Sequence, residues 1–147
     1  MRIELATITD IPALISLLNL LFSQEAEFQP DIEAQYRGLS TIISHPEIGE
    51  ILTIRTYDSI VGMINLLYTV STALGERVVL LEDMVVLPQF RGAGAGSKLL
   101  QAAIDYARES GCKRITLLTD GDNEAAQKFY RNHGFTASTM VPFRLKL

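Results

Sequence analysis

The chain has 147 residues, 48% of them hydrophobic, and a net charge of −4, which fits one globular domain over residues 1–147 and excludes a disordered chain. The acidic balance argues against nucleic-acid binding, and no apolar run approaches the roughly 18 residues of a membrane span. Because the N-terminus does not resemble a secretory signal and Cys112 has no second cysteine to pair with, we expect a cytoplasmic protein.

The first half of the chain predicts one strand, two helices and a hairpin. Thr9 or Asp10 can cap a helix whose apolar residues recur at helical spacing, and Asp31 can cap the next one. The hairpin follows from two runs of β-forming residues. In chain order the segments are a strand over 2–6, helices over 10–22 and 31–44, and strands over 50–56 and 60–70.

The second half predicts a strand–helix–strand unit, then a short helix begun by Asp122 or Asn123, then two closing strands. The segments are strands over 78–87 and 114–119 with a helix through 99–107 between them, a helix through 130, and strands over 135–138 and 140–147. The resulting order β-α-α-β-β-β-α-β-α-β-β indicates a mixed α/β fold.

Three glycines, Gly92, Gly94 and Gly96, lie between the predicted strand and helix. Backbone N–H groups in the first turn of a helix are unpaired, and glycines let a ligand approach them closely. The stretch therefore indicates a phosphate-binding loop, with Arg91 and Lys98 adding positive charge. It matches neither a Walker loop nor a dinucleotide fingerprint, and a turn that only joins the two elements is the alternative.

Two motifs resemble the GCN5-related N-acetyltransferase (GNAT) family. Arg91-x-x-Gly94-x-Gly96 matches the signature [RQ]-x-x-G-x-[GA], and "DNEAAQKFYRNHGF" (122–135) is similar to the family segment N-x-x-A-x-x-F-Y-x-x-x-G-F at the usual spacing. The resemblance covers about residues 78–135. It implies the GNAT fold, a central, mostly antiparallel twisted sheet with a splayed β-α-β unit and about four flanking helices. It also implies acetyl-CoA as co-substrate, an amine acceptor and a homodimer.

The same resemblance assigns the residues that bind the co-substrate. The pantetheine arm would pair with a free strand edge at Met84, Val85 and Val86, where one amide could also polarise the thioester oxygen. Asn123 would contact that arm, although it equally suits a helix N-cap. Backbone amides of the loop would bind the pyrophosphate, and these belong to Arg91, Gly92, Ala93, Gly94, Ala95, Gly96 and Ser97.

Two adjacent carboxylates, Glu82 and Asp83, interrupt an apolar strand. Because neighbours on a strand point to opposite faces, we expect polar surroundings on both faces there, and a solvated strand end is the alternative. A carboxylate with a raised pKa can deprotonate an amine. Glu82 resembles the family base, whereas Asp83 is either the base itself or a holder of a cationic acceptor. Tyr130 matches the tyrosine that protonates the departing thiolate, or is a core aromatic.

Acceptor contacts are the least defined part of the sequence. Glu25, in the acidic stretch 23–33, and Tyr68 are candidates, with a solvated loop as the alternative for the acidic stretch. Neither histidine suggests a metal site. We interpret the chain as an enzyme that moves an acetyl group directly to a primary amine of a small molecule, a polyamine, a peptide N-terminus or a lysine. A non-catalytic acyl-CoA-binding or sensing module is the alternative.

Overall fold

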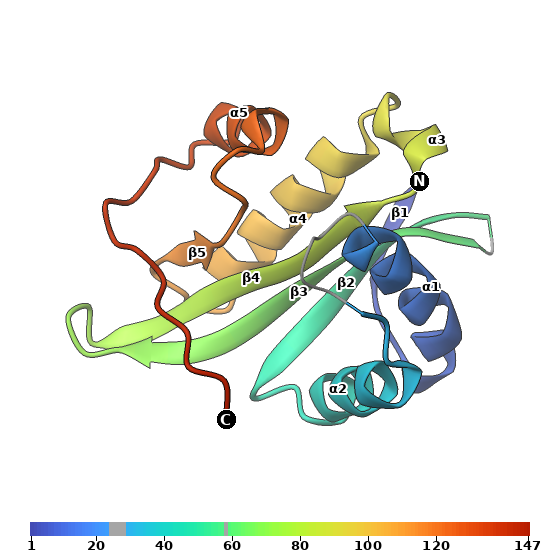
Figure 1. Ribbon diagram of the computed structural model, residues 1–147, viewed down its shortest axis with the longest axis horizontal. Helices are drawn as coiled ribbons and strands as arrows, with labels where there is room; N and C mark the ends of the chain where they lie inside the picture. The colour runs from blue at the N-terminus through green and yellow to red at the C-terminus, as the bar shows by residue number, and fades with distance from the viewer. Residues whose placement is uncertain (24–28, 58) are drawn as a thin grey trace.

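The computed structural model describes residues 1–23, 29–57 and 59–147. Its centre is a five-stranded sheet in the order β1-β2-β3-β4-β5 (Figure 1). Three pairings are antiparallel and only β4 and β5 run parallel, which confirms the mixed α/β class. The strands are β1 Arg2–Leu5, β2 Gly49–Thr56, β3 Ser59–Ser71, β4 Glu76–Val86 and β5 Ile115–Leu117.

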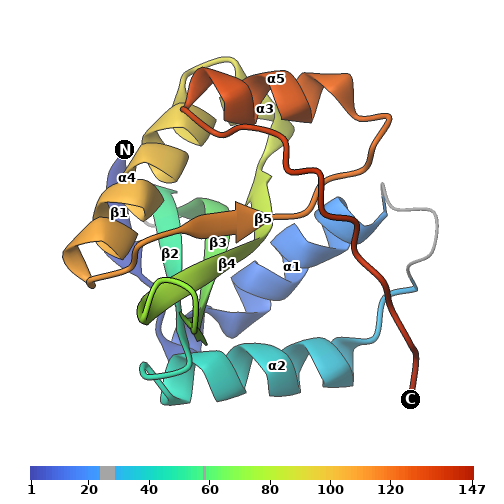
Figure 2. The ribbon, with the colours of Figure 1, turned by 90° about the vertical axis from the view of Figure 1, so that its left-hand side faces the viewer.

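Helices cover both faces of this sheet, with α1 and α2 on one side and α4 and α5 on the other (Figure 2). A 3-10 turn, η1, precedes α1, and a short helix that the sequence pattern did not predict, α3, precedes α4. The bounds are η1 Ile8–Asp10, α1 Ile11–Phe22, α2 Ile32–Ser44, α3 Pro88–Arg91, α4 Ala95–Glu109 and α5 Glu124–Asn132. In the described part of the chain no helix is long and apolar enough to cross a bilayer.

Each face of the sheet has its own apolar core. On one face, buried Leu99, Leu100 and Ala103 of α4 pack against residues such as Ile64 and Leu81. The other core joins α1 and α2 to the sheet, and its members are Ile11, Leu14, Leu17, Leu18, Leu39, Ile51, Met63 and Val85. Burial of these side chains on both faces is the main force that holds the helices to the sheet.

An ion pair ties the start of α1 to β2. Arg55 Nη2 lies 2.7 Å from Asp10 Oδ2, and both side chains are only 13% exposed. Burial acts to raise the pKa of Asp10, but hydrogen bonds from Arg55 and Thr7 and the Arg55 charge outweigh it, so that the pKa is lowered. The charged carboxylate is therefore favoured in the folded state.

The two closing strands predicted over 135–138 and 140–147 are not formed. Residues 135–147 make no strand in the structure, and Val141, Phe143 and Leu145 are 72%, 96% and 82% exposed. Their apolar alternation favours an extended chain, but a strand also needs a partner that supplies ladder hydrogen bonds. Pro142 additionally removes one donor from this segment.

We predict that Asp10→Asn lowers the free energy of unfolding by about 2 kcal/mol, because the mostly buried Arg55 guanidinium loses its less exposed carboxylate partner and keeps only Glu4, whose side chain is 46% exposed. Asp105→Asn is the matched control, since its pair with Arg108 is exposed and should contribute less than about 0.5 kcal/mol. Urea unfolding measures both values. Because the Asp10 pKa is lowered, its contribution is complete above the ordinary value of 3.8 and is lost as the pH falls below it. Equal losses in the two variants would contradict this assignment.

Candidate active site

Strands β4 and β5 separate halfway along β4. They pair only through Val79–Leu81 and Ile115–Leu117, and β5 ends there while β4 continues to Val86. On its other side β4 stays paired with β3 as far as Val86. From Glu82 onward, the β5-facing edge of β4 has no strand partner among the residues that the structure describes. This is the splayed β-α-β unit that the sequence led us to expect.

The glycine loop opens the long helix α4. Gly94 is the N-cap residue with φ of 80°, a left-handed conformation that favours glycine. No side chain of the described residues caps this end, so the first-turn amides of Ala95, Gly96 and Ser97 have no helical partner. A Cβ placed on Gly92 or Gly94 would meet nothing within 4 Å, so the space over the loop is open. The loop can therefore hold an anion such as a pyrophosphate.

The two cations beside the loop have different partners. Arg91 Nε donates to the backbone oxygen of Val86 at 3.0 Å, which fixes the loop to the end of β4. Lys98 Nζ donates to the backbone oxygen of Met1. Arg91 therefore positions the loop next to the free strand edge, whereas Lys98 anchors the N-terminus.

A β-bulge places both carboxylates on the same face of the sheet. Asp83 has φ of 53°, and the pairing with β3 shifts there, because Glu82 is opposite Asn65 while Val85 is opposite Met63. Directly opposed residues share a face, and Asn65 Nδ2 also donates to Asp83 Oδ2 at 2.7 Å. The alternation that we assumed from the sequence is therefore wrong at this point, since a bulge interrupts it.

Both carboxyl groups have raised pKa values. Burial, followed by the negative charge of Asp83, raises the pKa of Glu82. The positive charge of Arg144 acts to lower this pKa, and Glu82 remains exposed to solvent. Burial also raises the pKa of Asp83, and the hydrogen bond from Asn65 only partly offsets this. A raised pKa makes a carboxylate a better proton acceptor near neutral pH.

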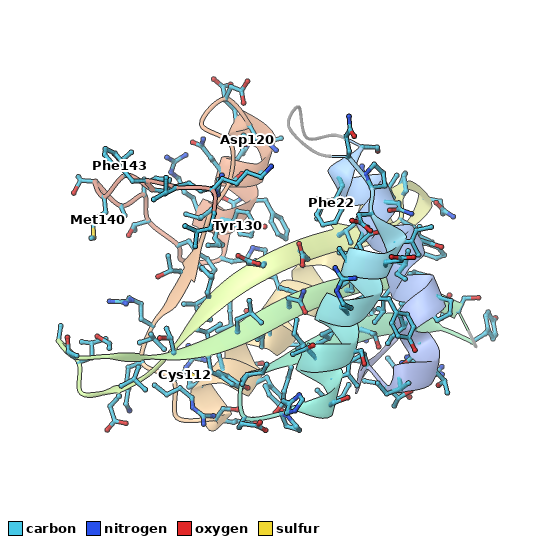
Figure 3. The ribbon with its side chains drawn as sticks, turned by 60° about the horizontal axis from the view of Figure 1, so that its bottom comes forward. Phe22, Cys112, Asp120, Tyr130, Met140 and Phe143 are labelled. Carbon is cyan, nitrogen blue, oxygen red and sulfur yellow. The ribbon has the colours of Figure 1, made fainter. Side chains whose placement is uncertain are left out.

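Tyr130 reaches β4 from the opposite side of the bulge. Figure 3 shows Tyr130 with its side chain beside β4. Its hydroxyl lies 3.8 Å from Met84 Sδ, and burial raises its pKa, so it stays protonated at neutral pH. The ring also packs edge-on against Phe129 and Phe135, with centroids 5.4 and 5.7 Å away. A Cβ on Gly96 would lie 3.6 Å from Phe129 and 3.9 Å from Met84. The glycine loop, β4 and α5 thus meet at Met84.

Not all of the other residues predicted for the site lie near the bulge of β4. Asn123 caps α5 by accepting from the amide of Ala126 at 3.1 Å. Tyr68 lies on the α4 side of the sheet, where the Arg77 guanidinium stacks 4.5 Å from its ring centroid, so it is separated from Glu82 by the sheet. Glu25 lies outside the described residues.

A pocket of about 270 Å³ adjoins the bulge, and its polar lining includes Gln35 and Asn65, two residues that sequence reasoning missed. Asn65 interrupts the apolar run "GMINLLY", and a buried amide in such a run is the signal that could have identified it. Gln35 gives no comparable signal, because it lies on a mixed helix face. The lining residues are Leu18, Phe22, Gln29, Asp31, Ala34, Gln35, Gly38, Leu39, Ile42, Asn65 and Asp83.

Comparison with known proteins agrees with this geometry. Residues 12–135 match the model of the acetyltransferase (GNAT) family. An uncharacterized N-acetyltransferase of Bacillus subtilis, YhfO, is 32% identical over 142 residues, covering 95% of this chain and 92% of that protein. An aminoalkylphosphonate N-acetyltransferase of Salmonella typhimurium is 29% identical, covering 90% and 83%.

Among solved structures, one described as a probable acetyltransferase superposes with a TM-score of 0.85 at 25% identity, covering 100% of this chain and 98% of the other. The family match spans most of the chain, and it includes the splayed strands, the glycine loop and α5. The chain therefore belongs to the GNAT family and is an N-acetyltransferase that uses acetyl-CoA.

Proposed function

We propose that the protein transfers an acetyl group from acetyl-CoA directly to a primary amine, in one complex and without an acyl-enzyme. The acceptor is a small amine or polyamine, a peptide N-terminus or a lysine. The observation that carries the proposal is the convergence on one bulge of β4. Two carboxyls of raised pKa lie on one face there, and the Tyr130 hydroxyl meets Met84 from the opposite side.

The unpaired backbone groups around β4 fit acetyl-CoA, the acetyl donor. The N-terminus of α4 holds the pyrophosphate through the loop amides between Arg91 and Ser97, and the open space over Gly94 admits it. The pantetheine arm lies along the unpaired edge of β4 at Met84, Val85 and Val86, like an added strand. Asn123 contacts that arm while it caps α5.

The two carboxylates have different roles in the proposed reaction. Asp83, fixed by Asn65, holds the acceptor ammonium, and Glu82 accepts its proton directly or through water. The neutral amine then forms the new C–N bond as the C–S bond of the thioester breaks. An amide N–H of Met84 or Val85 stabilises the charge on the carbonyl oxygen. Tyr130 donates its proton to the departing sulfur, and the second proton, which the nitrogen loses as the amide forms, returns through water to the Tyr130 oxygen.

We also propose that residues 1–147 form one cytoplasmic domain that dimerises. The single cysteine supports the cytoplasmic assignment. The dimer is supported by an exposed apolar segment, because Val141, Phe143, Leu145 and Leu147 alternate along the C-terminal chain and are all exposed. The outer edge of β5 likewise has no strand partner in the described ranges. Such edges and segments bind another chain readily.

We predict that Glu82→Gln and Tyr130→Phe each lower kcat by about 10²-fold or more, because each removes one proton-transfer group. The pH profile separates their roles. Wild-type kcat/KM falls as the pH drops through the raised pKa of Glu82, and Glu82→Gln should flatten this limb while Tyr130→Phe should keep it. Coenzyme A thiol release measures both effects.

The controls for that experiment are Glu76→Gln, on the exposed start of β4, and Tyr57→Phe, which is 91% exposed. Both should turn over at the wild-type rate. The mechanism is wrong if the two site variants match these controls at every pH. If acetyl-CoA binds and no acceptor is modified, the sensing module becomes the better explanation.

Alanine variants of two glycines test whether the loop binds the pyrophosphate. Gly94 and Gly111 have φ of 80° and 82°, and a Cβ on either meets nothing within 4 Å. Alanine at each position should therefore cost about 1 kcal/mol of stability through backbone strain. Only Gly94→Ala should also weaken coenzyme A binding, by about tenfold or more in calorimetry, because its Cβ enters the open space over the loop. Equal affinities in the two variants would place the pyrophosphate elsewhere.

We predict that light scattering gives twice the 16.3 kDa chain mass and that Phe143→Asp shifts it to the monomer. A carboxylate at this 96% exposed position would be costly to bury in an interface. Tyr57→Asp, at an exposed aromatic of the β2–β3 hairpin, is the control and should leave the mass unchanged. A monomeric wild type, or a Phe143→Asp variant that stays dimeric, rules out this interface.

A further inference from the structure

The pocket beside the bulge contains two buried amide oxygens without a hydrogen-bond partner. Gln35 and Asn65 are 8% and 2% exposed, and their Oε1 and Oδ1 atoms accept no hydrogen bond from the described residues. Their nitrogens are already engaged, because Gln35 Nε2 donates to Asn19 at 2.9 Å and Asn65 Nδ2 donates to Asp83. A buried oxygen left unpaired destabilises the folded protein, and a ligand with O–H or N–H groups would supply the missing hydrogen bond.

The charged residues of the pocket limit the kind of ligand that it can bind. Among the described residues that line it, two are carboxylates, Asp31 and Asp83, and none is a lysine, arginine or histidine. An anionic group on a ligand would find no counter-charge there and would lie close to Asp83. The pocket therefore favours a cationic or neutral ligand that donates hydrogen bonds.

Apart from Gln29, the remaining walls of the pocket are apolar. They come from α1 and α2, and the residues are Leu18, Phe22, Ala34, Gly38, Leu39 and Ile42. A cavity of about 150 Å³ holds one benzene molecule. The 270 Å³ found here therefore accommodates an aromatic ring together with a short alkyl chain.

The position of the pocket connects it to the chemistry. Asn65 is the cross-strand neighbour of Glu82 and the hydrogen-bond partner of Asp83. An amine that binds Asp83 and Asn65 Oδ1 is therefore next to the carboxylate proposed to deprotonate it. Gln35 belongs to α2, on the helix side of the pocket, where it can accept from a donor elsewhere on the same ligand.

We propose that this pocket determines the acceptor of the acetyl transfer, and that the acceptor is a primary amine on a compact apolar body with a second O–H or N–H donor and no anionic group. This inference rests on the proposed function. It assigns Gln35 and Asn65 as specificity-determining residues and makes amino acids, aminophosphonates and polyamines poor acceptors.

The first experiment compares coenzyme A thiol release for five acceptors. Tyramine has the proposed features, phenethylamine lacks the second donor, tyrosine adds a carboxylate, 2-aminoethylphosphonate is anionic, and spermidine lacks an apolar ring. We expect kcat/KM for tyramine to exceed each of the others by about tenfold or more, because a site built to bind a hydroxyl rejects the analogue without it. Preference for spermidine, tyrosine or the phosphonate would overturn the inference while confirming acetyl transfer.

The Gln35→Leu variant tests the second donor site. It removes Oε1, so tyramine should lose its advantage and match phenethylamine. Gln101→Leu is the matched control, since this exposed glutamine of α4 is bonded only to Asp105 on the same helix. The preference should persist there. An undiminished preference for tyramine in Gln35→Leu would contradict the role of Gln35.

The Gly38→Leu variant fills the pocket without disturbing the fold. A Cβ on Gly38 meets nothing within 4 Å, and replacement of a glycine inside a helix should stabilise it. We expect calorimetric binding of tyramine to the coenzyme A complex to weaken about tenfold or more, with coenzyme A affinity and unfolding free energy not reduced. Tyramine binding that is absent in the wild type or retained in this variant overturns the inference.

Binding and turnover separate the two proposals. Tyramine that binds the wild type but not Gly38→Leu, with no thiol released for any amine, would refute the proposed function and leave the pocket's ligand class standing.

Discussion

The β-bulge at Asp83 is the constraint on which the rest of the site depends. In a regular strand, Glu82 and Asp83 would face opposite sides of the sheet, and one of them would enter an apolar core. The left-handed backbone at Asp83 instead turns both toward Asn65. It also leaves Met84 to the other side, where Tyr130 reaches it. One irregular residue therefore gives the strand a face with both carboxylates and an opposite face with Met84 and Tyr130.

The raised pKa values follow from this placement. Loss of hydration at the edge of an apolar core raises the pKa of both carboxyl groups, and the negative charge of Asp83 raises the pKa of Glu82 further. A fold selected only for stability would avoid such a pair. Its presence where β4 loses its β5 partner supports the proton transfer that we propose for this site.

The unpaired oxygens of Gln35 and Asn65 fit the same pattern. Each costs stability in the free protein, and each lies in a pocket lined by apolar side chains and two carboxylates. Proteins break local rules of this kind mainly at functional sites, where a ligand restores the missing interactions. The ion pair of Arg55 and Asp10, in contrast, is fully matched and serves only to hold α1 on the sheet.

Elements with local signals could be predicted from the amino-acid sequence. Helical periodicity in α1 and α4, the glycine at the start of α4 and the Asn123 cap depend on neighbouring residues, so the β4–loop–α4 unit and the start of α5 were predictable, whereas Tyr130 was singled out by the resemblance to the family. The face of the carboxylates, the partner of Asp83 and the shared pocket of Gln35 and Asn65 follow from tertiary contacts instead. They depend on the register of β3 against β4 and on the packing of α2 against α1 and β2. The closing strands failed for the same reason, because alternation predicts an extended chain but not a pairing partner.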